Sequence, residues 1–553
     1  MCKEKNRWVY IITAVYFFVI LMVFGSFIGK DDDAIRSTLG NYDGHCTFVT
    51  YTFGWLVSRL YMLIPIINWY TIIIVVPYII FMIVLLKNKP ATYTSRNKGL
   101  VIGFILIMYT ILIMPLFVII NFTYVSGLYL LSGIILLISY KQDESRIKLW
   151  NIYFLFMMGY LIRLQVFFMA LPFIGLIIIY KLFQKEIIIS LSSTKKILLG
   201  LGIFLITIWI NNFGYSQGEW KQYMKNKENI TIIFDYYGWP DYEEYKTVYN
   251  NFGVYEKEKD LLDANIYMID GVDVEKLIEE CGRIQIEKYK NEISLKRIKE
   301  CIMNFYGFWL LPDCVVLNLF TISLCIAMIV SMGNRTNVTQ KEYLVISGCI
   351  CIAVLEILYL LWNGRVIYRA VWGVQVFLMC IVGCICNRKT FKTMDKSEKW
   401  PVVVVLGMLL SFFMVHSLYN CWEDSKKEKQ HYEVAESIAE YCGNNKEIMY
   451  FSTTRYGLYD NSNKLLYDKK ADNIMSLGLE SRGVSAKQKL EQRNIHNLVQ
   501  ALSEEKAYII VTQGDNASNQ LKVLMDFILE DYPEANWKQI EAHTEWEVLS
   551  LEL

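Results

Sequence analysis

The sequence predicts a polytopic α-helical membrane protein with about eleven transmembrane helices and a C-terminal α/β domain. The first observation is composition, because 54% of the 553 residues are hydrophobic and 15% are aromatic. The second is that the charged residues, 20% of the chain, concentrate in two stretches, 215–306 and 423–553. The third is the length of the remaining apolar runs. Most have roughly 17 to 25 residues, enough to cross about 30 Å of hydrocarbon.

The first apolar run follows Lys3, Lys5 and Arg7, as in a signal peptide. We interpret it as an uncleaved helix, because the run is long and no small-residue cleavage site follows it. Ten further runs come after it. The predicted spans are 8–28, 66–86, 99–120, 125–140, 149–162, 166–183, 197–213, 309–332, 343–361, 366–386 and 400–418.

The distribution of basic residues predicts the orientation of these spans. Alternate loops are rich in Lys and Arg, as cytoplasmic loops are, and the loops between them carry few charges. We therefore expect a plasma-membrane protein with a cytoplasmic N-terminus. The basic loops contain Lys87, Lys89, Arg96 and Lys98, then Lys141, Arg146 and Lys148, then Lys185, Lys195 and Lys196, then Arg335 and Lys341, and finally Arg388, Lys389, Lys392, Lys396 and Lys399.

This orientation divides the chain into a membrane region and an outer domain. The membrane region is 1–422 and includes a first outer loop, 30–65, and a large outer loop, 214–308, which is rich in Tyr and Trp. The extracytoplasmic domain is 423–553. Its strands and helices alternate, which indicates an α/β fold. The expected elements are helices near 427–441, 486–504 and 520–530 and strands near 447–452, 507–512 and 546–551.

Charge and cysteine usage exclude several classes of protein. The formal net charge is +1, and no basic stripe or recognition motif is present, so we expect no nucleic-acid partner. Many of the 13 cysteines lie inside apolar runs, and no CxxC pair recurs at the spacing of a zinc site. These cysteines are typical of core residues rather than of a disulfide or metal framework.

Three consecutive aspartates, Asp31, Asp32 and Asp33, follow the first span directly. A carboxylate at a membrane surface can accept the proton of a sugar hydroxyl or hold a divalent cation such as Mg²⁺ or Mn²⁺ against a phosphate. We take Asp32 and Asp33 as candidate catalytic residues and as the metal ligands if a metal is used. The alternative is that the acids only end the helix and keep that end outside.

A histidine follows in a predicted turn, Tyr42-Asp43-Gly44-His45. His45 could orient a phosphate or a hydroxyl group of a substrate. The alternative is an ordinary polar contact within the loop.

Arginines form the second group of candidates. Arg163 lies in a three-residue turn between two spans, and Arg365 and Arg369 lie at another outer turn. Cations are unusual on that side of a membrane protein, and guanidinium groups bind phosphate in a bidentate fork. We therefore expect these arginines to hold a lipid phosphate. For Arg369 the alternative is an internal ion pair with Glu356.

Several short motifs resemble bacterial multispanning proteins of the GT-C glycosyltransferase superfamily, over most of the membrane region. The resemblance implies transfer of a sugar, a hexose or a pentose, from a polyprenyl-phosphate donor to a glycan, lipid or protein acceptor outside the membrane, with an acid of the first outer loop at the centre of catalysis. Asp32 or Asp33 matches that acid. Gln165 falls where an acid would be expected and is a candidate for substrate binding. If the family needs a second carboxylate there, the alternatives are that this chain has lost activity or that it uses another acid. The motifs are Asp32-Asp33, Tyr42-Asp43-Gly44-His45, Gly54-x-x-x-Ser58-x-Leu60-Tyr61 with Pro65 and Trp69-Tyr70, Arg163-x-Gln165-x-Phe167 with Leu171-Pro172-Phe173, Phe234-Asp235-Tyr236 and Gly364-Arg365-x-x-x-Arg369.

Two other classes fit parts of the sequence. A transporter or polysaccharide export protein would also have many spans and outer arginines, although no internal repeat or broken helix pair is evident. A membrane-anchored scaffold would use only the outer domain. The glycosyltransferase class predicts that the acids of the first outer loop and the arginines Arg163 and Arg365 come together in one place.

Overall fold

The fold is that of a computed structural model of the whole chain. It describes residues 7–88, 98–140, 146–185, 191–269, 271–290, 295–310, 315, 317–319, 321–323, 340–363, 367–387, 400–453, 473–478, 481, 483–512 and 515–553. Contacts between residues divide the chain into two compact units. The first unit comprises mainly Met1–Asn212 and Leu295–Glu428, and the second comprises mainly Phe213–Ser294 and Lys429–Leu553.

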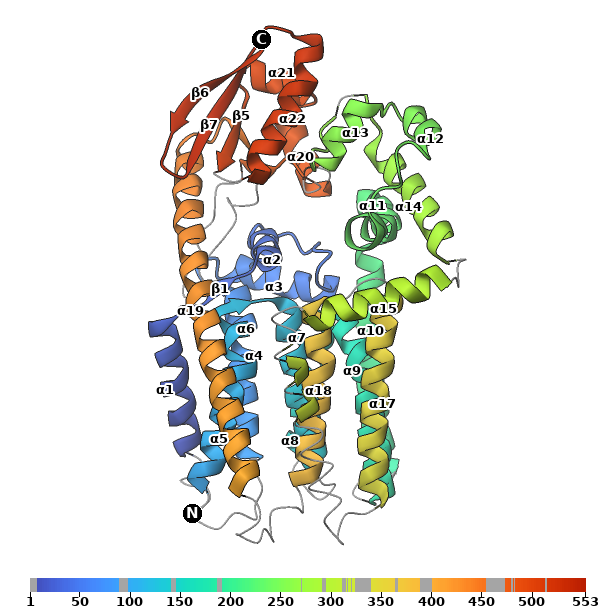
Figure 1. The fold of residues 1–553 in the computed structure, drawn as a ribbon, viewed down its shortest axis with the longest axis vertical. Helices are drawn as coiled ribbons and strands as arrows, with labels where there is room; N and C mark the ends of the chain where they lie inside the picture. The colour runs from blue at the N-terminus through green and yellow to red at the C-terminus, as the bar shows by residue number, and fades with distance from the viewer. Residues whose placement is uncertain are drawn as a thin grey trace. The chain divides into compact units, whose positions relative to one another are not determined.

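The first unit is a bundle of helices (Figure 1). The unit also contains two short strands, β1 (Phe27–Ile28) and β2 (Ile119–Ile120), which pair in parallel. The helices are α1 (Arg7–Val23), α2 (Lys30–Gly40), α3 (Tyr51–Leu63), α4 (Trp69–Lys87), α5 (Lys98–Leu112), α6 (Met114–Val118), α7 (Phe122–Ser139), α8 (Arg146–Ile162), α9 (Leu164–Phe183), α10 (Leu191–Gly214), α15 (Leu295–Leu310), α17 (Gln340–Trp362), α18 (Tyr368–Asn387) and the membrane part of α19 (Trp400–Asn444).

Among the described residues, five helices are long and apolar enough to cross a membrane, namely α4, α7, α9, α17 and most of α18. A sixth is counted if 199–214 and 218–237 form one bent span, and α1, α5 and α8 are shorter apolar helices. Helices thus occupy ten of the eleven predicted spans, while most of 309–332 lies outside the described residues. The chain is mostly helical, as expected. The count of eleven and the orientation stay predictions.

Helix packing in the centre of the bundle depends on small residues. A Cβ atom at Gly159 of α8 would lie 2.5 Å from the Leu130 side chain, and one at Gly133 of α7 would lie 2.6 Å from Phe156. Helices approach closely where glycine removes the side chain, which matters in a membrane because lipid offers no hydrophobic driving force for association. Helix α7 is accordingly buried on nearly all sides and forms the centre of the unit.

The second unit is built around a five-stranded sheet in the order β4-β3-β5-β7-β6 (Figure 1). Strands β4, β3 and β5 are parallel, and β7 pairs antiparallel with β5 and β6. Its elements are α11 (Gly218–Thr231), the π-helix Ile232–Tyr237, α12 (Lys246–Asn251), α13 (Glu256–Asp263), α14 (Val274–Lys290), the end of α19, β3 (Met449–Ser452), β4 (Ile474–Ser476), α20 (Val484–Gln492), α21 (Leu498–Ser503), β5 (Ala507–Thr512), α22 (Asp515–Asp531), β6 (Asn536–Ala542) and β7 (Trp546–Glu552).

Successive side chains of a strand point to opposite faces, and in β3, β5 and β7 the side chains on both faces are mostly buried. On one face, Phe451 and Ile509 share a core with α20 to α22 and with residues of the large loop such as Leu261 and Cys281. On the other face, strand residues including Tyr450 pack against the end of α19. The large loop and the C-terminal segment therefore share one hydrophobic core.

The structure confirms the expected strands at 447–452, 507–512 and 546–551 as β3, β5 and β7. The helix expected at 486–504 is wrong as a single element, because α20 ends at Gln492 and α21 begins at Leu498 with Asn497 as its N-cap. The helix expected at 427–441 is the end of α19, which runs without a break from the last predicted span.

Candidate active site in the first unit

The aspartate run forms the first turn of α2 rather than an extended loop. The helix starts directly after β1, and its N-cap, Gly29, donates its backbone N–H to the Ile120 carbonyl at 3.0 Å. A Cβ atom at Gly29 would lie 3.1 Å from that carbonyl oxygen, so glycine permits the close approach. Acidic residues stabilise the first turn of a helix, where the macrodipole is positive. The strand pair thus fixes the aspartates against the start of α7.

Asp32 is fully buried and bonded through both carboxylate oxygens. The Tyr70 hydroxyl donates to Oδ1 at 2.7 Å, and the backbone N–H of Phe122 donates to Oδ2 at 3.0 Å. Phe122 is the first residue of α7, so Asp32 caps that helix from a distant part of the chain. Burial raises the pKa of Asp32 to about 8, although the hydrogen bonds from Tyr70 and Phe122 act in the opposite direction. Asp32 connects α2, α4 and α7.

Asp33 is also fully buried, and its partner is Arg36 one turn later in α2. Arg36 donates from Nε at 3.1 Å and from Nη2 at 2.8 Å to the same carboxylate oxygen of Asp33. A buried pair of this kind neutralises two charges inside the protein, and losing one partner leaves the other charge uncompensated. The geometry indicates a structural role for Asp33.

Asp31 differs from its two neighbours because part of its carboxylate is exposed. Its Oδ2 atom lies 3.3 Å from Nη1 of Arg369, and the two side chains are 24% and 29% exposed. Arg369 is the second residue of α18, where the positive end of the helix macrodipole disfavours a cation unless an anion is close. The ion pair that the sequence offered as an alternative, Arg369 with Glu356, is replaced by this pair with Asp31.

Arg163 lies beside the same end of α7. It is the N-cap residue of α9, and its Nη1 donates to the Phe48 carbonyl at 3.2 Å. Its guanidinium lies over the Phe122 ring, 4.7 Å from the centroid. The backbone N–H of Phe122 also bonds Asp32. Phe122 therefore contacts Arg163 through its ring and the aspartate run through its backbone.

His45 follows α2 in a turn that packs on α3. Its Nδ1 lies 2.9 Å from Oδ1 of Asp43, which also accepts the His45 backbone N–H. A carboxylate only accepts, so Nδ1 carries a proton and Nε2 is the acceptor nitrogen when the ring is neutral. The turn fits closely because a Cβ atom at Gly54 of α3 would lie 2.2 Å from the Gly44 carbonyl oxygen. His45 is thus oriented by Asp43.

The structure therefore brings most of the predicted residues to one region, where α2, the start of α7, the start of α9 and the start of α18 meet. Gln165 is exposed on the first turn of α9. Arg365 lies outside the described residues. Sequence reasoning did not predict the contacts of Asp32 with Tyr70 and Phe122 or the ion pair of Asp31 with Arg369.

The aspartates do not fit a divalent cation as they stand. Both oxygens of Asp32 accept hydrogen bonds from the protein, and Asp33 faces Arg36. In the part of the chain that the structure describes, no three His, Cys, Asp or Glu side chains lie close enough to share a metal ion. We therefore derive no chemical step through a metal.

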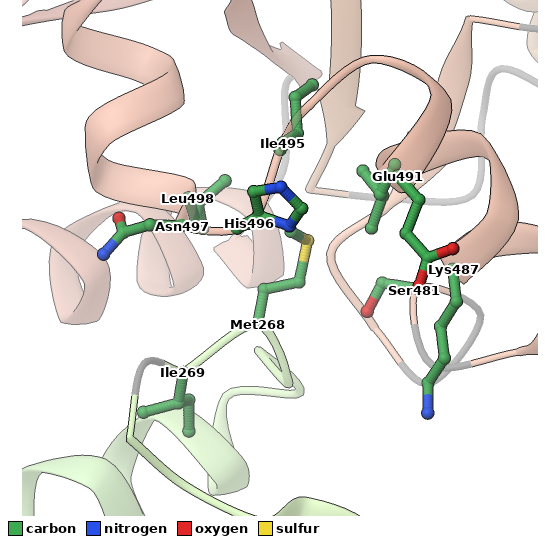
Figure 2. A pocket seen from close by; sticks show the side chains of 10 residues that line it. Met268, Ile269, Ser481, Lys487, Glu491, Ile495, His496, Asn497 and Leu498 are labelled. Carbon is green, nitrogen blue, oxygen red and sulfur yellow. The ribbon is translucent and has the colours of Figure 1, made fainter.

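A separate pocket of about 200 Å³ lies within the second unit. It is formed by the loop at Met268 and Ile269, by α20 and by the turn that contains His496 and Asn497, and Figure 2 shows the His496 ring beside the Met268 thioether. None of the predicted site residues lines it. Asn497 accepts the Gln500 backbone N–H as the cap of α21, so part of its polar lining is structural.

Comparison with known proteins gives two similar solved structures. No family model matches the chain, and no curated protein matches it. The crystal structure of ArnT from Cupriavidus metallidurans in the apo state is 12% identical, with a TM-score of 0.42 over 98% of this chain and 97% of that chain. The crystal structure of the same protein bound to undecaprenyl phosphate is 11% identical, with a TM-score of 0.40 over 99% and 98%. At these TM-scores, the assignment of function depends on the site itself.

Proposed function

We propose that this protein is an integral membrane glycosyltransferase that transfers a sugar from a polyprenyl-phosphate donor to a hydroxyl group of an acceptor. The observation that carries the proposal is the ion pair of Asp31 with Arg369. It combines a partly exposed carboxylate in the first turn of the short helix α2 with a partly exposed guanidinium in the first turn of α18, a helix long enough to span a membrane. A carboxylate can accept a proton, and a guanidinium can bind a phosphate. The lipid-linked donor class is the one that the sequence resemblance implies.

In the proposed reaction, the Asp31 carboxylate accepts the proton of the acceptor hydroxyl. The acceptor oxygen forms the new bond to the anomeric carbon while the bond from that carbon to the donor phosphate oxygen breaks. The electron pair leaves with the phosphate, and positive charge develops on the sugar in the transition state. Arg369 and Arg163 stabilise the negative charge that grows on the leaving phosphate.

This assignment moves the base from Asp32 and Asp33, which the sequence favoured, to Asp31. The reason is burial, because a base has to reach the proton that it removes. Asp32 and Asp33 have no exposed surface, and both are held by protein donors. Asp32 instead fixes the position of Asp31 by joining α2 to α4 and α7, and Asp33 pairs with Arg36 within α2. His45, with its acceptor nitrogen set by Asp43, is a second group that can orient a hydroxyl or a phosphate.

Arg369 has two alternative anionic partners in this scheme. In the structure it pairs with Asp31, and a partly exposed ion pair contributes on the order of 1 kcal/mol or less. A lipid phosphate can bind the same guanidinium in a bidentate fork, which is a stronger interaction. Donor binding would then draw Arg369 from Asp31 and leave the carboxylate available to the acceptor.

The test is transfer by the purified full-length protein. The chain is reconstituted in vesicles with a panel of polyprenyl-phosphate sugars and candidate glycan, lipid and protein acceptors, and the product is detected by mass spectrometry. We expect a sugar adduct with release of the polyprenyl phosphate. Movement of intact lipid-linked sugar across the vesicle membrane, with no transfer from any donor, would instead establish the transporter class.

A further inference from the structure

Helix α15 (Leu295–Leu310) carries a face of apolar side chains that are exposed in the structure. Ile298, Ile302 and Phe305 recur at spacings of four and three residues, which places them on one face of the helix. All three are exposed, and so are Met303 and Tyr306, at 64% and 63%. Glu300 and Asn304, also exposed, lie on the opposite face. Neighbouring exposed apolar side chains on one helix face indicate an interaction surface.

The position of α15 is fixed by its contact with α17. The Cys301 thiol donates to the Leu361 carbonyl at 3.5 Å, so the helix lies at the end of α17. Figure 1 shows it running across that end of the helix rather than along it. A helix in this orientation lies along a membrane surface when its neighbour crosses the membrane.

The surface of α17 next to this contact is exposed and apolar. In the last two turns of α17, the side chains of Leu355, Leu358 and Tyr359 are exposed. Only 28% of the most apolar 18-residue stretch of α17 is buried within the protein. Tyr and Trp are enriched where a spanning helix meets the headgroup layer. Tyr359 and Trp362 lie in the last turn of α17, as expected for a helix end at that layer. The exposed face of α15 thus continues the lipid-facing surface of α17 at the level of the headgroups.

Charge indicates which lipids the helix contacts. The first turn of α15 includes Lys296 and Arg297, Lys299 follows, and the first turn has no acidic residue. Cations at the start of a helix oppose the macrodipole, so they destabilise α15 unless anions are close. Anionic headgroups supply such charges, and basic amphipathic helices bind them.

We propose that α15 is an interfacial helix that inserts its apolar face among lipid acyl chains and binds anionic phospholipid headgroups through its basic start. The inference rests on the exposed face, the contact with α17 and the three basic residues. It does not depend on the sugar-transfer reaction. A second copy of the chain or another segment of the same chain are the alternative occupants, and the test separates them.

The test places a photo-crosslinking amino acid, p-benzoylphenylalanine, at position 302 or at position 300 of the full-length protein. The protein is reconstituted in nanodiscs of equal parts phosphatidylcholine and phosphatidylglycerol, irradiated and analysed by mass spectrometry. We expect lipid adducts at position 302 and severalfold fewer at position 300 on the opposite face. Position 358 of α17 is the positive control, because it shows that each preparation is folded and in lipid.

The charge part of the proposal is tested by Lys299→Gln. We expect the ratio of phosphatidylglycerol to phosphatidylcholine adducts at position 302 to fall by up to about fivefold, as for the loss of one basic residue near an anionic surface. The Lys296→Gln/Arg297→Gln/Lys299→Gln variant should lower it further. Crosslinks from position 302 to protein, or equal lipid adducts at 300 and 302 while position 358 labels normally, would overturn the interfacial assignment. An unchanged lipid ratio in the triple variant would overturn the headgroup preference.

Discussion

The Asp31 carboxylate lies 3.3 Å from the Arg369 guanidinium, although 338 positions separate the two residues in the sequence. Each residue is in the first turn of a helix, α2 for Asp31 and α18 for Arg369. The positive helix ends favour the aspartate and disfavour the arginine. An anion beside Arg369 is therefore favourable, and Asp31 supplies it.

The first prediction separates Asp31 from Asp32. Asp31→Asn keeps the size of the side chain and removes the base, so sugar transfer should fall by about 10²- to 10⁴-fold. Asp32→Asn should cost much less, because the amide oxygen can still accept from Phe122 and the amide N–H can donate to the Tyr70 oxygen. Initial rates of transfer by purified protein measure both. A larger loss in Asp32→Asn than in Asp31→Asn would return the catalytic role to the buried aspartate.

The second prediction concerns the shape of the cation at Arg369. Arg369→Lys keeps the charge but not the bidentate fork, so transfer should fall by on the order of tenfold, mainly through weaker donor binding. Arg283→Lys is the matched control, since Arg283 forms an exposed ion pair with Glu280 on α14 and should tolerate the change. Dependence of the rate on donor concentration is the measurement. The same loss is expected for Arg365→Lys, and equal activity of the variants and parent would mean that neither arginine binds phosphate.

The third prediction follows from the raised pKa of Asp32. Its folded pKa of about 8 lies above the usual value of 3.8, so the folded state holds the proton more tightly than the unfolded state. The stability contributed by this proton is complete below about pH 4, declines as the pH rises and is lost above about pH 8. Thermal unfolding of the protein in detergent, measured between these limits, should show this decline. The Asn side chain of Asp32→Asn does not titrate, so the thermal stability of this variant should depend less on pH. An equal pH dependence of thermal stability in the variant and the parent would contradict a raised pKa of Asp32.

The fourth prediction concerns the two structural aspartates. Asp32→Ala leaves the Phe122 N–H and the Tyr70 hydroxyl without their acceptor, which costs about 1–3 kcal/mol for each group. Asp33→Ala leaves the buried Arg36 without its carboxylate, at a cost of about 3–5 kcal/mol. Glu300→Ala, at an exposed position of α15, is the control. Loss of activity in the first two variants should accompany loss of thermal stability, whereas Asp31→Asn should lose activity alone.

Much of the membrane region could be predicted because its signals are local. Apolar runs and flanking basic residues give ten helices close to their observed positions, and β5 coincides with the run Ala507–Thr512. The short strand β4 and the edge strand β6 were missed. Strand β4 has only three residues, and the sequence of β6, Asn-Trp-Lys-Gln-Ile-Glu-Ala, has little apolar alternation because the strand is largely exposed. These strands depend on pairing with neighbours that a local pattern does not contain.

The site was predicted in composition but not in detail. Asp31, Asp32 and Asp33 are equivalent in the sequence, and only the fold buries two of them. Which aspartate is exposed depends on Tyr70 and on the N-terminus of α7, both distant in the chain. The joint burial of the large loop and the C-terminal segment in one core was missed for the same reason, since each segment looks like a separate soluble piece.

The last prediction concerns topology and decides whether the proposed chemistry can occur outside the membrane. The loop at 387–399 is rich in Lys and Arg, and one further predicted span, 400–418, lies between it and the C-terminal domain. Helix α19 continues from Trp400 to Asn444 without a break, so no second crossing intervenes along it. A reporter that is active only outside the cytoplasm should therefore be active when fused after Leu553. The same reporter fused after Lys396 is the matched control and should be inactive. The opposite result in both fusions would place Asp31, Arg163 and Arg369 on the cytoplasmic face, and the donor would then have to be sought among lipid-linked sugars of the inner leaflet.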